Sequence, residues 1–223
     1  MVWAVLAAAG RGERLGTDRP KAFARLGERP LLAESMERLE SSGWIDAIVV
    51  AAPPEWEEPA ILLAEELGAG KVSSVVTGGE SRSESVRLAL AEVPHDAAVA
   101  LVHDAARPLV SDTVIERVLA PLSEGWDGVV PALPVSDTVK RVQRDQVVET
   151  LPRDELVAVQ TPQAFVASML RDALGGNVAE ASDCASLVEA RGGRVKVVEG
   201  DRRLVKVTGP EDLALVESWL NGA

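Results

Sequence analysis

The chain opens with the apolar run Val2-Trp-Ala-Val-Leu-Ala-Ala-Ala9, which leads directly into Gly10-Arg-Gly-Glu-Arg-Leu-Gly16. A short apolar run with β-branched residues is typical of a buried strand, and the glycines predict a loop where the strand ends. No basic residues precede the run, so it does not match a secretion signal. A buried strand followed by a glycine-rich loop is a common beginning of an open α/β sheet.

Strands of the same kind recur along the chain and alternate with helical patterns. We predict strands at residues 2–9, 47–52, 71–77, 97–102 and 128–133, with amphipathic helices at 32–39, 56–67, 86–93 and 114–122. This alternation predicts a Rossmann-like α/β fold, with an open, mostly parallel sheet flanked by helices. The length of 223 residues fits one domain, residues 1–223.

Residues 135–162 interrupt this alternation. Two strand-like segments, 138–142 and 147–150, flank the polar turn Arg144-Asp-Gln146 and predict a β-hairpin. An isolated hairpin is marginal in water, so it must be a flap on the main sheet or an arm that reaches a partner. Beyond it, the pattern predicts helices at 165–174 and 184–190, strands at 194–199 and 204–207, and a last helix beginning near Thr208-Gly-Pro-Glu211.

The composition excludes several classes of function. A formal net charge of −12 argues against an extended nucleic-acid or anionic-membrane surface, and no apolar run approaches the ~20 residues of a membrane span. The single cysteine, Cys184, excludes an internal disulfide and a cysteine-rich metal site, which favours a reducing cytoplasm. Only two histidines, His95 and His103, are present, so zinc chemistry and histidine-driven triads are disfavoured.

The loop after the first strand is basic within this acidic chain. Residues 10–29 contain six basic and three acidic residues, a net charge of +3 that leaves −15 for the rest. Glycines that allow close backbone approach, together with arginine and lysine, predict a polyphosphate site, although a solvated basic loop is the plain alternative. The P-loop pattern is absent, and Gly16 comes one residue late for a dinucleotide fingerprint.

Six further motifs follow this loop in order. Ala8-Ala-Gly-x-Gly-x-Arg14 with Pro20-Lys21 resembles the signature loop of nucleotidyltransferases that activate sugar and polyol phosphates. The others are Gly78-Gly-Glu-Ser-Arg-Ser-Glu-Ser-Val86, Val102-His-Asp-Ala-Ala-Arg-Pro108, Asp137-Thr-Val-Lys140, Thr161-Pro-Gln-Ala-Phe165, Ser182-Asp183 and Val205-Lys-Val-Thr-Gly-Pro-Glu-Asp212. Together they resemble the 2-C-methyl-D-erythritol 4-phosphate cytidylyltransferase family over essentially the whole chain.

The resemblance implies a set of residues for CTP. The nucleotide would lie against Ala8, Ala9, Gly10, Gly12, Gly79, Glu80, Ser85, Asp104 and Ala105. Arg14 and Lys21 would stabilise the α-phosphate in the transition state. Mg²⁺ or another divalent cation would be bound mainly through the CTP phosphates, and we assign it no protein ligand.

The resemblance also implies a second set of residues, for a polyol phosphate acceptor. Arg107, Thr138, Arg153, Thr161 and Lys206 would bind it, and Arg153 and Lys206 would place its phosphate for attack. The resemblance implies a homodimer in which the hairpin arm of each subunit crosses to the other subunit. Thr138 and Arg153 would therefore reach the partner's acceptor site, whereas Lys206 would serve its own chain.

Several residues of these motifs also have a plainer interpretation. Ser81 and Glu84 match a helix capping box, His103 fits a structural role better than a base, and Cys184 fits a small helix residue. Taken alone, Arg153 would be a turn residue and Lys206 a strand residue. The sequence departs from the family's usual residues at four positions: Ala22, Glu80, Ser182 and Cys184.

Three other functions remain as alternatives. A ribitol 5-phosphate cytidylyltransferase would share the nucleotide half and differ around the acceptor. A non-catalytic nucleotide-binding regulator would keep the fold, but it would not need both a transition-state charge pair and an acceptor clamp. A nicotinamide-dependent dehydrogenase is disfavoured by the position of the third glycine.

Overall fold

The computed structural model describes residues 1–10, 12, 15–16, 18–176, 178 and 181–222. The strands are β1 (Val2–Ala7), β2 (Arg25–Leu26), β3 (Arg29–Pro30), β4 (Ala47–Ala52), β5 (Val72–Thr77), β6 (Val99–Asp104), β7 (Gly128–Pro134), β8 (Val139–Gln143), β9 (Gln146–Leu151), β10 (Val157–Val159), β11 (Gln163–Val166) and β12 (Val195–Glu199). The α-helices are α1 (Leu31–Ser41), α2 (Glu57–Glu66), α3 (Arg82–Ala91), α4 (Asp112–Leu119), α5 (Ala167–Leu174), α6 (Cys184–Ala190) and α7 (Pro210–Asn221). Short 3₁₀ helices are η2 (Lys21–Phe23), η3 (Ala120–Glu124) and η4 (Arg153–Glu155). Among these described segments, no helix combines the length and apolarity needed to cross a bilayer.

The predicted mostly parallel sheet is confirmed. Its strand order is β10-β7-β11-β6-β1-β4-β5, with β12 beside β7. β6, β1, β4 and β5 pair in parallel, as do β7 and β12. β10 and β11 run against β7, and β11 also separates β7 from β6. Parallel neighbours require crossover connections, and the predicted helices supply them.

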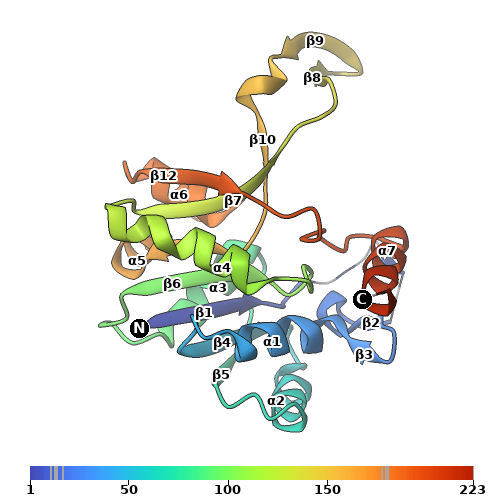
Figure 1. Ribbon diagram of the computed structural model, residues 1–223, viewed down its shortest axis with the longest axis vertical. Helices are drawn as coiled ribbons and strands as arrows, with labels where there is room; N and C mark the ends of the chain where they lie inside the picture. Colours follow the sequence, from blue (N-terminus) through green and yellow to red (C-terminus); the bar gives the residue numbers. More distant parts are fainter. Residues whose placement is uncertain (11, 13–14, 17, 177, 179–180, 223) are drawn as a thin grey trace.

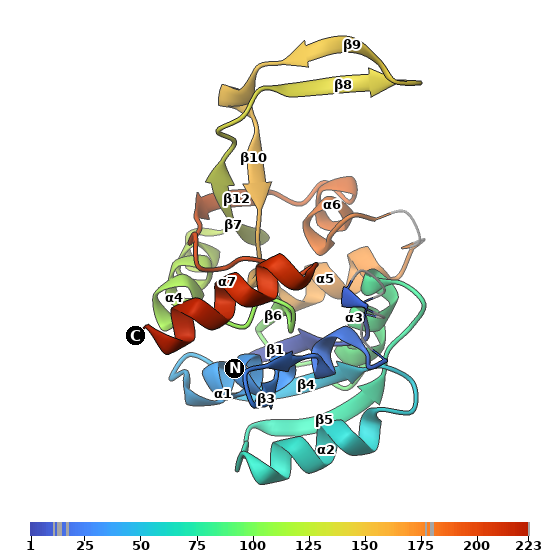
Figure 2. The same cartoon turned by 90° about the vertical axis from the view of Figure 1, so that its right-hand side faces the viewer.

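Helices cover both faces of this sheet (Figure 1, Figure 2). Successive side chains of a strand point to opposite faces, so Ala4 and Leu6 of β1 pack in the core formed with α1, α2 and α4. Val5 faces the opposite core, formed with α3, α5 and α6. Burial on both faces explains why the strands are apolar throughout rather than alternating with polar residues.

The carboxyl ends of β1, β4, β5 and β6 meet at one edge of the sheet. The chain leaves these ends at Ala8, Pro53, Gly78 and Ala105. Backbone hydrogen bonds tie the exits together, from Ala8 N–H to the Ala51 carbonyl, from Gly78 N–H to Ala52 and from Ala105 N–H to Ala7. In open α/β sheets this edge is where ligands bind.

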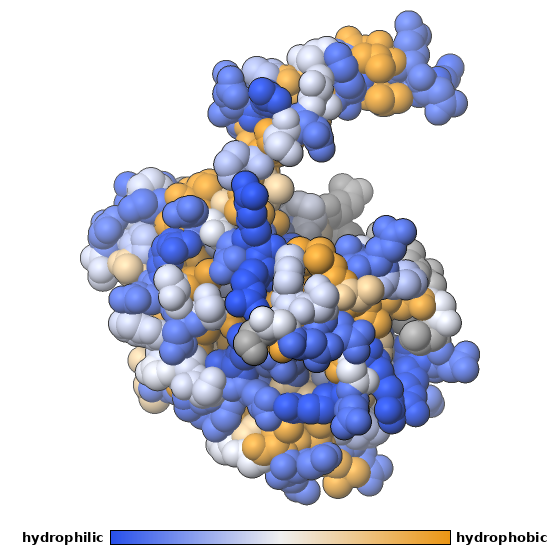
Figure 3. Space-filling view, turned by 45° about the vertical axis from the view of Figure 1, so that its right-hand side comes forward, coloured by the Kyte–Doolittle hydropathy of each residue, from blue (hydrophilic) through white to orange (hydrophobic). Residues whose placement is uncertain are grey.

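The predicted hairpin is formed by β8 and β9, which stand clear of the main body (Figure 1, Figure 2). Its apolar side chains Val142, Val147 and Val148 are about half exposed, and apolar patches interrupt the hydrophilic surface of the arm in Figure 3. Within residues 135–162, β10 differs from the hairpin because it returns to the main sheet and pairs with β7. The arm is therefore connected to the main sheet through β7 on one side and β10 on the other.

The predicted helix at 165–174 is confirmed as α5, although it begins at Ala167. Residues 163–166 instead form β11, a strand that the sequence did not predict, because Phe165 is fully buried between β6 and β7. The predicted strand at 204–207 is wrong. Residues 204–207 form no strand, although Leu204 and Val207 are buried. This segment crosses the end of the sheet, where Val207 N–H donates to the Ala106 carbonyl, and no strand of the described chain pairs with it.

Candidate active site

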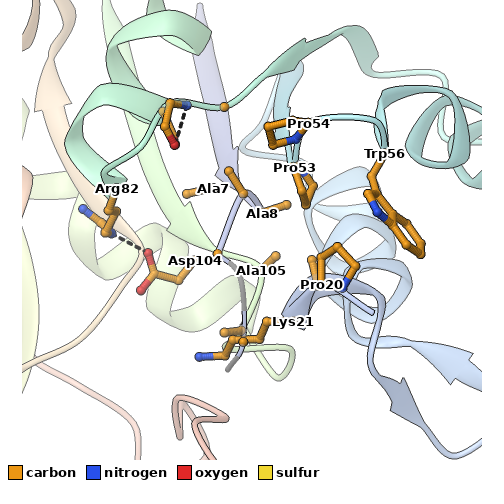
Figure 4. A pocket seen from close by; sticks show the side chains of 18 of the residues that line it. Ala7, Ala8, Pro20, Lys21, Pro53, Pro54, Trp56, Arg82, Asp104 and Ala105 are labelled. Atoms are coloured by element: carbon orange, nitrogen blue, oxygen red, sulfur yellow. Dashed lines mark hydrogen bonds and ion pairs between the residues drawn. The ribbon is translucent and has the colours of Figure 1, made fainter. Parts of the chain in front are cut away.

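A cavity of about 1260 Å³ opens at the carboxyl edge of β1, β4, β5 and β6. In Figure 4, Arg82 and Asp104 lie on one side of it, and Pro53, Pro54 and Trp56 lie on the other. All the residues predicted to bind the nucleotide line this cavity: Ala8, Ala9, Gly10, Gly12, Gly79, Glu80, Ser85, Asp104 and Ala105. We call it the nucleotide cavity. The fold thus brings together residues from five widely spaced parts of the sequence.

The glycine-rich loop holds Lys21 at the wall of the nucleotide cavity. The Lys21 backbone N–H donates to the Gly10 carbonyl at 3.2 Å. Gly12 has φ +72°, and a Cβ there would lie 2.7 Å from the Lys21 Cβ. A side chain at Gly12 would therefore displace Lys21, which explains this glycine. Arg14 lies outside the described residues, and its predicted role stays a prediction.

The loop before α3 forms the part of the cavity predicted to receive the base. Ser81 Oγ accepts from Glu84 N–H at 3.1 Å, as the capping interpretation predicts. In a regular capping box the Glu84 carboxylate would accept from the N–H of Ser81. Here it accepts from the N–H of Glu80, one residue earlier. Gly79 N–H donates to Ser85 Oγ at 3.0 Å. The loop is therefore held by its own hydrogen bonds, while the Glu80 side chain is exposed.

The Asp104 carboxylate forms ion pairs with two basic side chains at the end of the nucleotide cavity. Its Oδ1 accepts from Arg82 Nε and its Oδ2 accepts from Lys206 Nζ, both at 2.7 Å. Only 5 % of Asp104 is exposed. Burial alone would raise the pKa of this carboxyl, but the charges of Arg82 and Lys206 outweigh burial and hold the pKa well below its usual range. We call these three residues the ion triad.

Arg82 is not among the residues predicted from the sequence. A signal was available, because Arg82 is the first residue of α3. A cation at a helix N-terminus is disfavoured by the helix dipole, so a positive residue there calls for a nearby anion. That anion is Asp104, the last residue of β6, which is 22 residues away in sequence.

A second cavity, of about 610 Å³, adjoins the first. Arg107, Thr161 and Lys206, three of the predicted acceptor-binding residues, line it, and we call it the acceptor cavity. The guanidinium of Arg107 donates to the Leu204 carbonyl at 2.6 Å, so Arg107 also anchors the segment that carries Lys206. Gln163 lines the acceptor cavity as well, and its amide donates to Asp183 at 2.9 Å.

His103 has a structural place beneath the acceptor cavity, as predicted. It is fully buried, with Nε2 3.0 Å from the Arg107 carbonyl and Nδ1 3.1 Å from Thr161 Oγ1. A carbonyl only accepts, so Nε2 carries the proton and Nδ1 accepts from the Thr161 hydroxyl. Thr161 Oγ1 in turn accepts from the Asp104 N–H. Thr161 therefore fixes the backbone of Asp104.

The burial of His103 predicts a pH-dependent stability. Burial lowers the pKa of His103 to about 4, and the nearby Asp104 only partly opposes this. Between pH 6.5 and 4, His103 takes up a proton in the unfolded chain but stays neutral in the folded one. The free energy of unfolding therefore falls as the pH falls. We expect His103 to account for a loss of about 3 kcal/mol over that range. Urea unfolding at several pH values measures it.

A pair of histidine variants isolates this effect. His103→Gln keeps a donor for the Arg107 carbonyl but cannot titrate, so its free energy of unfolding should fall less than that of wild type between pH 6.5 and 4. His95→Gln, at the only other histidine, should retain the wild-type pH dependence. Equal pH dependence in wild type and His103→Gln would contradict the assignment.

The two predicted site residues on the arm lie apart from the others. Thr138 and Arg153 are exposed and line neither the nucleotide cavity nor the acceptor cavity. Arg153 Nη1 donates to the Ser136 carbonyl at 2.6 Å, which fixes the base of the arm. A single chain therefore brings Lys21, Asp104, Arg107, Thr161 and Lys206 together but not Thr138 or Arg153.

The acidic side chains of the site do not form a cage for a metal ion. Among the described residues, no group of three or more His, Cys, Asp or Glu side chains could hold one. Asp18, Glu80 and Glu84 line the nucleotide cavity at separate points, and Asp104 is engaged by two cations. This donor set fits Mg²⁺ carried by a polyphosphate, because Mg²⁺ keeps several waters and needs only one or two carboxylates.

Comparison with known proteins shows which family this chain is similar to. The profile of the 2-C-methyl-D-erythritol 4-phosphate cytidylyltransferase family matches residues 2–222. The enzyme of that name from Nocardia farcinica is 46 % identical over 221 residues, covering 99 % of this chain and 94 % of the relative. The one from Frankia casuarinae is also 46 % identical, over 220 residues, covering 98 % of this chain and 81 % of the relative.

Solved structures are similar over the same length. The crystal structure of 2-C-methyl-D-erythritol 4-phosphate cytidylyltransferase from Thermus thermophilus has a TM-score of 0.77 and 34 % identity, with 97 % of this chain and 98 % of that one covered. The 4-diphosphocytidyl-2C-methyl-D-erythritol synthase from Anaerococcus prevotii has a TM-score of 0.84 and 25 % identity, covering 99 % and 98 %. From its fold, its site and these matches, the chain belongs to the 2-C-methyl-D-erythritol 4-phosphate cytidylyltransferase family.

Proposed function

We propose that this chain transfers the cytidylyl group of CTP to 2-C-methyl-D-erythritol 4-phosphate, giving 4-diphosphocytidyl-2-C-methyl-D-erythritol and diphosphate for isoprenoid biosynthesis. The observation that carries the proposal is the meeting of two cavities at the ion triad, with Lys21 on the nucleotide side and Arg107 on the acceptor side. Family membership supplies the names of the two substrates.

The chemistry proposed is a direct displacement at the α-phosphorus of CTP. An oxygen of the acceptor phosphate forms the new bond, and the bond to the β-phosphate oxygen breaks, so diphosphate leaves with the electron pair. A phosphomonoester is already an anionic nucleophile, so no strong base and no covalent enzyme intermediate are needed. The neutral, fully engaged His103 is consistent with this.

The barrier to this reaction is repulsion between two anions, so the protein has to supply positive charge at fixed positions. We assign stabilisation of the α-phosphate to Lys21 and Arg14. Lys206 and Arg107 would orient the acceptor phosphate, because basic side chains form strong, charge-assisted hydrogen bonds with phosphate. Asp104 and Ala105 would contact the ribose from the end of β6.

We propose Mg²⁺ as the divalent cation. The triphosphate oxygens would hold this ion. The protein would contribute at most one carboxylate ligand from the nucleotide cavity. When bound, the ion neutralises part of the triphosphate charge. The chain's own contribution is to position the α-phosphate with backbone groups of the loop from Ala8 to Gly12 and with Lys21.

We further propose that the protein works as a homodimer through the hairpin arm. The half-exposed valines of β8 and β9 favour burial in a partner, since an isolated hairpin is marginal in water. Thr138 and Arg153 would then complete the acceptor cavity of the other subunit. Because a single cysteine excludes an internal disulfide, we also propose the cytoplasm as the compartment of this protein.

Diphosphate release tests the proposed function. The protein is incubated with CTP and Mg²⁺, and 2-C-methyl-D-erythritol 4-phosphate or ribitol 5-phosphate is added in parallel. Release with the first acceptor alone is expected. Release with ribitol 5-phosphate alone would retain the mechanism and overturn the acceptor. CTP binding without release with either acceptor would favour a nucleotide-binding regulator.

A further inference from the structure

The nucleotide and acceptor cavities share a wall. Among the described residues, three line both cavities, and they are Arg82, Asp104 and Lys206, the ion triad. They come from the start of α3, the end of β6 and the segment after β12. A group transferred from a ligand in one cavity to a ligand in the other has to pass this wall.

Arg82 is the innermost cation of the triad. Its side chain is 22 % exposed, compared with 39 % for Lys206. Its Nε binds Asp104, its Nη1 lies 3.6 Å from the Cys184 sulfur, and its Nη2 is buried without a hydrogen-bond partner among the described residues. The Asp104 charge outweighs burial and raises the pKa of Arg82, so the guanidinium keeps its charge.

Stability alone is a weak explanation for this arrangement. A buried ion pair contributes little net stability, because both charges lose their hydration. Arg82 has two further disadvantages, an Nη2 that finds no hydrogen-bond partner in the described part of the chain and a position at a helix N-terminus. Its remaining effect is geometric. It binds one carboxylate oxygen of Asp104 and leaves the other to face Lys206.

We propose that Arg82 is a positioning residue for the transfer reaction, which holds Asp104 and, through Asp104, fixes Lys206 at the wall between the two cavities. The inference rests on the proposed function for its kinetic consequence but not for its geometry. Without Arg82, the Asp104 carboxylate can turn toward Lys206 alone, and the Lys206 amine loses its fixed position toward the acceptor. Loss of Arg82 should therefore lower kcat/KM for the acceptor more than it weakens the binding of CTP.

The charge balance around Asp104 predicts an electrostatic signature as well. The titratable or charged groups that interact with Asp104 are Arg82, Lys206, Arg107, His103 and Cys184. His103 is neutral and the thiol of Cys184 is buried, so the charges that lower the Asp104 pKa most are those of Arg82 and Lys206, ahead of that of Arg107. Removing Arg82 leaves the burial in place and removes one cation, so the Asp104 pKa must rise.

Three variants test the proposal. Arg82→Gln removes the charge, Arg82→Lys restores it on a shorter group, and Arg87→Gln removes an exposed arginine of the same helix whose ion pair within the described chain is with Glu84. For Arg82→Gln we expect kcat/KM for the acceptor to fall about 100-fold, with less than about threefold change in the Kd of CTP. Arg82→Lys should recover at least about tenfold of that loss, and Arg87→Gln should match wild type.

A second readout does not depend on catalysis. Titration of the Asp104 carboxyl carbon by ¹³C NMR should show a higher midpoint in Arg82→Gln than in wild type, by at least about one pH unit, with Arg87→Gln unchanged. The acidic limb of kcat/KM for the acceptor should move upward with it. An unmoved Asp104 titration, or equal losses for Arg82→Gln and Arg87→Gln, would overturn the proposal. If the wild type is inactive but the Asp104 midpoint is still higher in Arg82→Gln than in wild type, the proposed function would be overturned and the geometric role of Arg82 would be retained.

Discussion

Lys21→Ala is expected to lower kcat at least about 100-fold, the cost typical of losing one preorganised charge or donor at a transition state. Lys21 begins η2, and its backbone is packed against Gly10 and Gly12 at the wall of the nucleotide cavity. The backbone that carries this charge is therefore held in place before the substrates bind. Because charge gathers on the α-phosphate only during transfer, the Kd of CTP should change much less than kcat.

Single-turnover diphosphate release with saturating CTP measures this effect, and calorimetry measures CTP binding. The matched control is Arg25→Ala, which removes the same charge from the same basic segment at an exposed residue that lines neither cavity. Arg25→Ala should keep wild-type kcat. A wild-type kcat for Lys21→Ala, or a loss confined to CTP binding, would exclude the role assigned to Lys21.

Arg153→Ala is expected to lower kcat/KM for the acceptor by about 100-fold, although Arg153 touches neither cavity of its own chain. The reason is the proposed crossing of the arm, which would place this guanidinium at the acceptor phosphate of the partner. Steady-state kinetics with varied acceptor measure it. Arg144→Ala, at the exposed tip of the same hairpin, removes the same charge and should retain activity.

A mixing experiment separates this crossing from an effect within one chain. Lys21→Ala and Arg153→Ala are each nearly inactive by the predictions above. In a heterodimer, the chain with an intact Lys21 would receive an intact Arg153 from the other chain. After random exchange of equal amounts, about a quarter of the sites should therefore be active. A mixture as inactive as its components would show that the arm does not serve the partner's site.

Local sequence patterns predicted most of the fold because they depend on near neighbours. Apolar runs located β1, β4, β5 and β7 to within two residues at each end, and the turn at residues 144–146 located the hairpin. The pattern failed where a partner decides the structure. Phe165 has helical spacing with later residues, but β6 and β7 leave a gap that only an extended segment can fill. Residues 204–207 alternate like a strand but pair with no strand of the described chain.

The site divides in the same way. The sequence by itself determined that a glycine-rich basic loop follows the first strand and that acidic and basic residues follow later ones, because residue type and spacing are local properties. Only the tertiary structure decided that Arg82, Asp104 and Lys206 form one ion triad, since Lys206 lies 102 residues from Asp104. Which charges meet depends on the strand order, which sets the edge where loops distant in sequence converge and bury an anion between two cations.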